Sequence, residues 1–198
     1  MLRLYDFGDS GNCYKIRLLL TQLAIPFEPI EVDILKGESR TPEFLQKNTN
    51  GRVPVLETES GEFLSESNAI MFYLSEGTEF FPTDRWERAK VMQWLCFEQY
   101  SHEPYIATTR FWIKELGKAE EYAEAIAQKR EPGYAALGVM EKHLTQHSFF
   151  VGERYTIADI GLFAYTHVAD EGGFDLTRFP AILSWIERVK AQPRYIGL

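Results

Sequence analysis

The sequence has little cysteine and no long apolar run. Only Cys13 and Cys96 occur among 198 residues, which excludes a disulfide framework and predicts two free thiols. No stretch approaches the roughly 18 uninterrupted apolar residues of a membrane-spanning helix, and the first residues lack the apolar core of a signal peptide. We therefore expect a cytoplasmic protein that does not enter a membrane.

Basic residues are also scarce. The chain carries 21 basic and 29 acidic residues, a formal net charge of −8, which argues against nucleic acid or anionic lipid as a partner. Residues 1–80 contain 7 basic and 13 acidic side chains. A small anionic ligand held by this part would need well-placed local donors.

Several familiar catalytic patterns are missing. The sequence shows no Ser-His-Asp order, no phosphate-binding loop and no paired zinc cysteines. His143 and His147 have the i, i+4 spacing that can bind zinc, but no third ligand stands nearby. We predict no metal site.

Hydrophobic periodicity divides the chain into two parts. The elements expected in the first part are a strand at 2–5, a helix at 16–24, a strand at 27–34, a short helix at 42–46, a hairpin formed by 53–56 and 62–64, and a helix at 67–75. The strand–helix–strand opening predicts a parallel pair. The first domain is thus an α/β unit of order βαβ–ββα over residues 1–77.

Beyond residue 77 the pattern is helical. The expected helices are one capped by Thr83 or Asp84, one over 118–144 that Pro132 and Gly133 interrupt and bend, one beginning at Thr156, and one from 180 towards 191. We predict a second, all-α domain over residues 84–198.

The most informative motif lies where the first strand gives way to the first helix. Ser10, Gly11 and Asn12 stand there, and free backbone N–H groups and the positive end of the helix dipole converge on such a point. A bound thiolate would be favoured there, because these groups can lower a thiol pKa from about 8.5. The alternative is that Ser10 or Asn12 only caps the helix.

Two further motifs follow. A cis bond at Val53–Pro54 would turn the backbone of Val53 outward to pair with an extended peptide, and Arg52 would supply a cation for a carboxylate. Alternatively, Pro54 only starts an edge strand and Arg52 is solvated. At the start of the next helix, Ser67 could bind a second carboxylate and Glu66 an ammonium, or both could serve as caps.

The order and spacing of these three motifs, together with Thr156-Ile157-Ala158-Asp159-Ile160 near the end, resemble the glutathione transferase family over essentially the whole chain. The resemblance implies a thioredoxin-like first domain, a helical-bundle second domain, glutathione as co-substrate and a homodimer. It assigns Asp159 a structural role. The Ser-x-Asn spacing is similar to the serine-type and the bacterial disulfide-reducing branches.

The resemblance also implies roles for individual residues. Ser10 and Asn12 would be the catalytic donors to the sulfur, with Tyr5 as a rival phenol. The residues that would bind the remainder of glutathione are Arg52 (glycyl carboxylate), Val53 and Pro54 (cysteinyl backbone), and Glu66 and Ser67 (γ-glutamyl end). Ser10 to Cys13 resembles a Cys-x-x-Cys motif whose first cysteine is serine, so Cys13 is expected inside the helix and inert.

An aromatic and polar segment in the second domain is the expected electrophile pocket. Its candidates are Tyr100, His102, Tyr105 and Arg110. The predicted function is conjugation of the glutathione thiolate to small hydrophobic electrophiles in detoxification. The alternatives are a glutathione-dependent disulfide oxidoreductase and a noncatalytic interaction module with the same fold.

Overall fold

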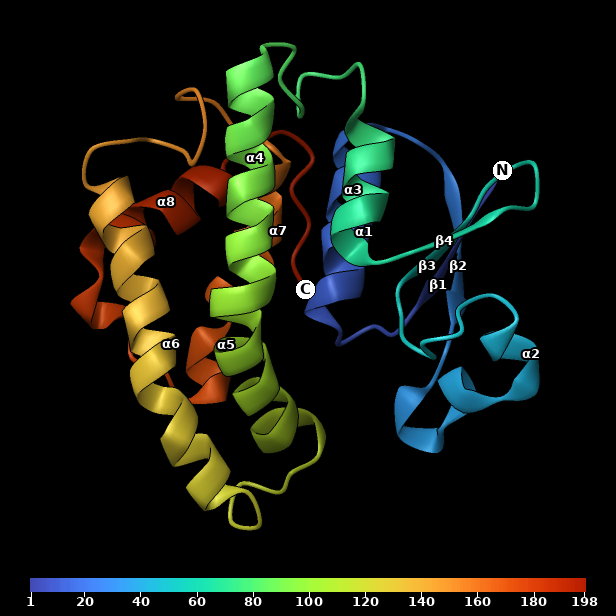
Figure 1. The fold of residues 1–198 in the computed structure, drawn as a ribbon, viewed down its shortest axis with the longest axis horizontal. Coiled ribbons are helices and arrows are strands. Elements are labelled where there is room, and N and C mark those ends of the chain that lie inside the picture. The colour runs from blue at the N-terminus through green and yellow to red at the C-terminus, as the bar shows by residue number, and fades with distance from the viewer. The chain divides into compact units, whose positions relative to one another are not determined.

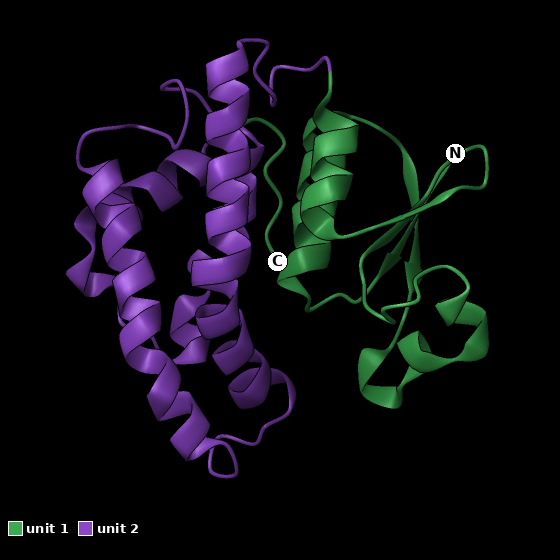
Figure 2. Cartoon of the chain, in the orientation of Figure 1, with its two compact units in different colours: residues 1–76, 193–198 green, residues 77–192 purple.

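A computed structural model of the chain describes residues 1–198. The chain forms two compact units, residues 1–76 with 193–198 and residues 77–192 (Figure 2). The sequence predicts that the final residues belong to the helical domain, whereas the structure places them in the first unit. There the Tyr14 hydroxyl donates to the carbonyl oxygen of Ile196 at 2.7 Å. A single bond of this kind has no periodicity, so the sequence pattern does not reveal it.

The first unit has the predicted order of elements. These are β1 (Leu2–Asp6), α1 (Gly11–Gln22), β2 (Phe27–Glu31), α2 (Pro42–Leu45), β3 (Val55–Glu57), β4 (Phe63–Ser65) and α3 (Ser67–Ser75). The strands form one sheet in the order β2-β1-β3-β4, in which β1 is parallel to β2 and the other pairs are antiparallel. The thioredoxin-like βαβ–ββα arrangement is confirmed.

The second strand is shorter than predicted. It ends at Glu31 rather than at residue 34. The Asp33 carboxylate accepts hydrogen bonds from the backbone N–H groups of Leu35 and Lys36, at 3.0 and 3.1 Å, and starts a 3-10 turn. A short polar side chain that bonds to its own backbone in this way competes with the strand ladder.

The two faces of the sheet bury different side chains. Leu4 pairs with Leu56 across β1 and β3, and both are fully buried. Because neighbouring residues of a strand point to opposite faces, Tyr5 points the other way, where it joins Val55 and Phe44 of α2. Figure 1 shows α1 and α3 together on one side of the sheet and α2 on the other. Tyr5 and α1 therefore lie on opposite faces.

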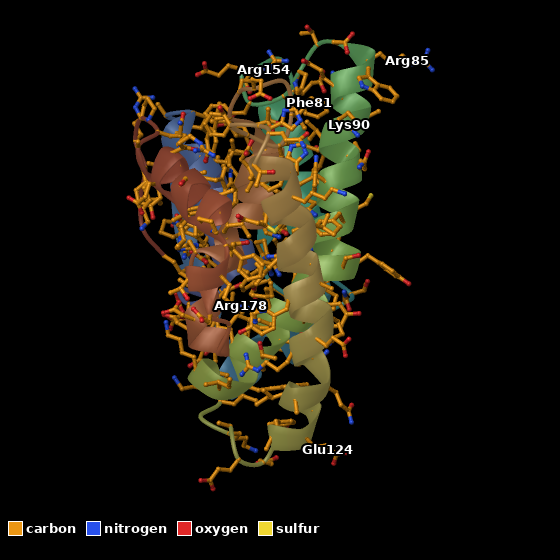
Figure 3. The ribbon with its side chains drawn as sticks, turned by 90° about the vertical axis from the view of Figure 1, so that its left-hand side faces the viewer. Phe81, Arg85, Lys90, Glu124, Arg154 and Arg178 are labelled. Atoms are coloured by element: carbon orange, nitrogen blue, oxygen red, sulfur yellow. The ribbon has the colours of Figure 1, made fainter.

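The second unit consists of helices and connecting turns, as predicted. Its α-helices are α4 (Arg85–Phe97), α5 (Glu103–Arg110), α6 (Ala123–Leu144), α7 (Ile157–Thr166) and α8 (Pro180–Lys190). Figure 3 shows Arg85, at the start of α4, and Glu124, in the first turn of α6, at opposite ends of the unit, so these helices run antiparallel. None of the helices combines the length and the apolar character that crossing a bilayer requires.

Two π-helical turns, Glu98–His102 and Phe111–Glu115, flank α5. The sequence analysis does not predict them. Pro104 explains the first, because proline lacks an N–H group and its ring clashes with the carbonyl four residues earlier. The N–H of Glu103 bonds to the carbonyl of Glu98, five residues back. The helix thus widens to a π-helical turn at the point where proline disfavours an ordinary α-helical turn.

Helix α6 departs from its prediction in two ways. It begins at Ala123 rather than at residue 118, and it continues through Pro132 to Leu144 without interruption. Gly133 permits close packing there, because a Cβ at this position would lie 2.4 Å from a ring carbon of Phe174. The Pro-Gly pair therefore marks a tight contact inside the unit and not the predicted interruption.

Helix α7 begins with a capping box formed by Thr156 and Asp159. The Thr156 hydroxyl accepts from the N–H of Ala158 at 3.3 Å, and the Asp159 carboxylate accepts from the N–H of Thr156 at 2.9 Å. Asp159 also accepts from the indole N–H of Trp185 at 3.0 Å and from the N–H of Phe150 at 3.2 Å. This carboxylate therefore ties α7 to α8 and to the segment before α7, which supports its structural interpretation.

Candidate active site

An ion pair between Arg17 and Asp6 stabilises the loop between β1 and α1. Arg17 of α1 donates to the buried carboxylate of Asp6 at 2.5 Å and to the carbonyl oxygen of Gly8 at 2.7 Å. The N–H of Ser10 bonds to the carbonyl of Phe7 at 2.9 Å. These bonds fix the backbone at the point where the predicted donor Ser10 enters the helix.

Ser10 is the N-cap of α1, and its cap geometry does not use the hydroxyl hydrogen. The Ser10 oxygen accepts from the N–H of Cys13 at 3.3 Å. The side chain is half-buried. A hydroxyl that accepts one bond can still donate one, so the capping and donor interpretations of Ser10 are compatible.

Asn12 and Ser67 meet although they are far apart in the sequence. The Ser67 hydroxyl donates to the side-chain carbonyl oxygen of Asn12 at 3.2 Å. The Lys15 ammonium in turn donates to the Ser67 oxygen at 3.4 Å. The structure thereby connects the starts of α1 and α3, and two of the predicted site residues lie together.

Lys15 was not among the residues predicted from the sequence. Its side chain is fully buried in α1. The available signal was its spacing to Leu18 and Leu19, because residues three and four apart share a helix face. Lysine is almost never fully buried unless it is paired, so a lysine in register with an apolar face is a candidate for such a pair.

Cys13 is fully buried, as predicted. Its sulfur accepts from the N–H of Phe7 at 3.5 Å. Burial, followed by the nearby Asp6 charge, raises the pKa of the Cys13 thiol to about 12. The thiol therefore stays protonated and unreactive near neutral pH.

Tyr5 is engaged on the far face of the sheet. Its hydroxyl donates to the Glu57 carboxylate at 2.8 Å. Burial and this hydrogen bond raise the pKa of Tyr5 to about 12. The geometry thus favours Ser10 and Asn12 over Tyr5 as the groups at the start of α1.

The segment before β3 holds a stretch of unpaired backbone. The Val53–Pro54 peptide bond is cis, and the N–H and carbonyl of Val53 make no hydrogen bond within the chain. Just before it, the Asn48 side chain donates to the carbonyl oxygen of Arg52 at 2.8 Å. Arg52 is exposed. Val53 can therefore pair with an extended backbone, and the Arg52 side chain is accessible to an anion.

Glu66 has an unusual backbone conformation. Its φ is 69° and its ψ is 111°, and its exposed side chain makes no capping bond to α3. The Ser67 hydroxyl points to Asn12 instead, so the capping alternative fails for both residues. A non-glycine residue held in such a region costs about 1–3 kcal/mol, and such residues cluster at functional sites.

The four electrophile-pocket candidates have different environments in the second unit. His102 is fully buried and its ring Nε2 lies 2.9 Å from the Thr166 hydroxyl. Arg110 is 2% exposed and is ion-paired with Glu171 at 2.6 Å. Both side chains therefore lie inside the second unit and are engaged there, and their pocket roles stay predictions.

The two tyrosines among these candidates are accessible. Tyr100 is 84% exposed. Tyr105 is half-buried, and the Lys129 ammonium lies 5.4 Å from the centre of its ring. The sequence does not show that these two tyrosines are accessible while His102 and Arg110 are buried. The π-helical turns change which residues of this segment share a helix face.

The histidine pair of α6 belongs to an aromatic cluster. The rings of His143 and His147 stack with centroids 4.5 Å apart, and His143 lies 4.9 Å from Trp94. His147 is paired with the Glu153 carboxylate. No group of three His, Cys, Asp or Glu side chains that could hold a metal ion occurs in the structure.

Known proteins share this fold. Residues 1–76 match the model of the glutathione S-transferase N-terminal domain, and residues 93–193 match that of the C-terminal domain. The disulfide-bond oxidoreductase YfcG of Escherichia coli K12 is 31% identical over 98% of this chain and 92% of its own length.

Solved structures agree with these matches. A glutathione S-transferase from Pseudomonas fluorescens Pf-5 is 52% identical, covers 99% of this chain and 98% of its own, and superposes with a TM-score of 0.97. A family member from the same organism with two glutathione bound is 26% identical, covers 98% and 89%, and has a TM-score of 0.84. This chain belongs to the glutathione S-transferase family.

Proposed function

We propose that this chain is a glutathione transferase that conjugates the glutathione thiolate to small hydrophobic electrophiles. The observation that carries the proposal is a pair of polar side chains at the start of α1. The oxygen of Ser10 accepts from the backbone and the carbonyl oxygen of Asn12 accepts from Ser67. The Ser10 hydroxyl therefore keeps a hydrogen to offer to an anion. The family member with two glutathione bound supports the identity of the ligand.

The other proposed residues match the remaining groups of the tripeptide. The unpaired backbone of Val53 suits the cysteinyl backbone, and the exposed Arg52 suits the glycyl carboxylate. The exposed carboxylate of Glu66 suits the γ-glutamyl ammonium, and Ser67 lies at the helix start beside it. The ligand thus meets one donor or acceptor for each of its polar ends.

The proposed chemistry is that of the ligand's sulfur. The thiol releases its proton to water, and the donors and the positive helix end stabilise the thiolate. A hydrogen bond to a charged group contributes about 1.5–3 kcal/mol, which corresponds to a lowering of the thiol pKa by about 1–2 from about 8.5. The thiolate electron pair then forms a bond to the electrophilic carbon, and with an aryl halide the carbon–halogen bond breaks and the halide leaves with its electron pair. Tyr100 and Tyr105 remain the proposed contacts of the electrophile.

Replacement of Ser10 tests this role. One donor to a developing anion is worth about 3 kcal/mol, so Ser10→Ala should slow conjugation roughly a hundredfold and leave glutathione affinity nearly unchanged. Ser10→Thr keeps both hydroxyl and cap and should retain most of the rate.

A matched control separates catalysis from capping. The Asp84 carboxylate caps α4 by accepting from the N–H groups of Trp86 and Glu87, both at 2.9 Å. Asp84→Ala removes a cap of comparable stability from the other unit and should not change the rate. An unchanged rate in Ser10→Ala would transfer the role to Asn12.

A second candidate function keeps glutathione and changes the reaction. The relative YfcG is a disulfide-bond oxidoreductase, and the bound thiolate could attack a disulfide sulfur and release the second sulfur as a thiolate. Turnover of a disulfide and of an aryl halide by one preparation separates the two activities. Failure to bind glutathione at millimolar concentration in calorimetry would favour a noncatalytic module.

We also propose that the protein works in the cytoplasm as a homodimer with a part in detoxification. Two large apolar side chains of α4, Trp86 and Met92, are 70% and 41% exposed. Apolar side chains exposed along one helix are a feature of surfaces that bind another protein. Sedimentation velocity should show twice the mass of one chain.

A further inference from the structure

The backbone between α2 and β3 is held by one buried side chain, that of Asn48, which is 7% exposed. Its side-chain NH₂ group donates to the carbonyl oxygen of Arg52 at 2.8 Å, and its side-chain oxygen accepts from the N–H of Asn50 at 3.0 Å. Its main-chain carbonyl accepts from the N–H of Gly51 at 2.8 Å. Asn48 therefore bonds to each of the three residues that precede Val53.

The chemistry of the two side-chain partners fixes the orientation of the Asn48 amide. A peptide carbonyl can only accept a hydrogen bond, and a peptide N–H can only donate one. The NH₂ end must therefore face the Arg52 carbonyl, and the oxygen end must face the Asn50 N–H. With the amide turned over, two oxygens would meet at one end and two N–H groups at the other.

A second contact restrains the same loop. The Arg40 guanidinium donates to the carbonyl oxygen of Asn50 at 2.8 Å. Gly51 has a φ of 62°, and a Cβ at this position would lie 2.7 Å from a side-chain nitrogen of Arg40. Because these contacts do not involve the Asn48 side chain, replacement of that side chain should act mainly on the peptide group that follows.

The bond to Arg52 also sets the direction of the Val53 N–H. The peptide bond between these two residues is trans, since the cis bond lies one residue later. In a planar trans peptide the carbonyl and the N–H point in opposite directions. The Val53 N–H therefore points away from Asn48. It makes no hydrogen bond within the chain, and it belongs to the backbone proposed to pair with the cysteinyl residue of glutathione.

We propose that Asn48 is a positioning residue for glutathione, because it directs the Val53 N–H toward the cysteinyl carbonyl. The inference rests on the proposed function and adds a residue to it. Asn48 acts through the Arg52–Val53 peptide group and needs no contact with the tripeptide. It should therefore affect the affinity for glutathione and leave the ionisation and reaction of the sulfur to the start of α1.

Two substitutions of Asn48 test this role by calorimetry with glutathione. Asn48→Asp keeps the shape of the side chain and an acceptor for the Asn50 N–H, but it places an oxygen against the Arg52 carbonyl. Asn48→Ala removes both side-chain bonds. Each should weaken glutathione binding about fivefold, as expected when one neutral hydrogen bond is lost. The pKa of the bound thiol and the turnover at saturating glutathione should match the wild type.

Thr41→Ala is the matched control for these variants. The Thr41 hydroxyl donates to the carbonyl oxygen of Glu38 at 3.0 Å and accepts from the N–H of Phe44 at 3.3 Å. The control thus also removes one donor and one acceptor to the backbone beside α2, but neither partner belongs to the Val53 peptide group. It should leave glutathione affinity unchanged. Circular dichroism and urea unfolding establish that each variant is folded.

A change in the ligand separates positioning from a general loosening of the loop. The probe is a glutathione analogue in which a trans carbon–carbon double bond replaces the cysteinyl–glycyl peptide group. This analogue keeps the shape and lacks the carbonyl that would accept from Val53. The wild type and the Asn48 variants should bind it with affinities that agree within about twofold, because the bond that Asn48 supports is absent in every case. Either Asn48 variant suffices for the comparison if the other does not fold.

The outcomes separate the two levels of the proposal. A wild-type protein that does not bind glutathione refutes the proposed function and the role of Asn48 with it. A wild type that binds, with both Asn48 variants unchanged, overturns the positioning role alone. Equal losses for glutathione and for the analogue also overturn it, because the substitution would then disturb the loop as a whole. A loss confined to glutathione supports the role.

Discussion

Replacement of Asp159 by alanine should unfold the second unit far more readily than any surface change. The Asp159 carboxylate is fully buried and accepts from the N–H groups of Phe150, Thr156 and Trp185 at 3.2, 2.9 and 3.0 Å. Asp159→Ala leaves these three donors buried without partners, and each unsatisfied donor costs about 1–3 kcal/mol. The expected loss is at least about 3 kcal/mol of the typical 5–15 kcal/mol of unfolding free energy.

Urea unfolding at pH 7, followed by circular dichroism, measures this loss as a shift of the midpoint at constant slope. Asp170→Ala is the matched control, since Asp170 is an exposed aspartate of the same unit and its loss should change stability by less than about 0.5 kcal/mol. Glutathione affinity of folded Asp159→Ala should equal that of the wild type. A loss below about 1 kcal/mol would refute the view that this carboxylate holds the helices together.

Asp159 also predicts a pH dependence. Burial raises the pKa of the Asp159 carboxyl to about 6 from its ordinary value of 3.8, against the opposing hydrogen bonds from Trp185, Thr156 and Phe150. The folded state therefore holds this proton more tightly than the unfolded state. Its contribution to stability is complete below about pH 4 and is lost as the pH rises through 6. The wild type should gain about 2.5 kcal/mol relative to Asp159→Asn between pH 7 and pH 4, and a relative loss would contradict this sign.

Two further changes test the first unit. Tyr5→Phe removes the 2.8 Å bond to Glu57 on the face opposite α1, so it should cost about 1 kcal/mol of stability and leave the conjugation rate within about twofold. A hundredfold slower rate would assign the thiolate to Tyr5. Glu66→Gly relieves the backbone at φ 69° and should stabilise the fold by about 1 kcal/mol while it weakens glutathione binding. Glu66→Ala should weaken binding equally without the gain, and unchanged affinity in both variants would remove Glu66 from the site.

The fold was largely predictable because its elements are strongly periodic. The helix predicted over 67–75 has the observed bounds Ser67–Ser75, since a polar start is followed by apolar residues at helical spacing. The errors arise where a single side chain overrides the pattern. Asp33 ends β2 early through two bonds to its own backbone, and Pro104 widens a turn that periodicity treats as regular.

The candidate site was predictable only in part. The sequence pattern identifies Ser10, Asn12 and Ser67 as candidates because they are polar residues at the start of a helix. The contact of Lys15 with Ser67 spans 52 positions, and no local pattern encodes such a contact. In the second unit, composition predicted an aromatic and polar surface but not that His102 faces the interior, because widened turns change which residues share a helix face.

The acidity of the first unit need not oppose a bound thiolate. Its exposed carboxylates act through water and salt, and interactions beyond about 8 Å are largely screened at physiological ionic strength. Other carboxylates of the unit are already paired with cations, as Asp6 is with Arg17 and Asp33 is with Lys36. The sulfur would instead meet the proposed hydroxyl and amide donors at the start of α1 in direct contact. Preoriented donors of this kind need no rearrangement when the charge arrives, so the net charge of the unit is a poor guide to the charge of its ligand.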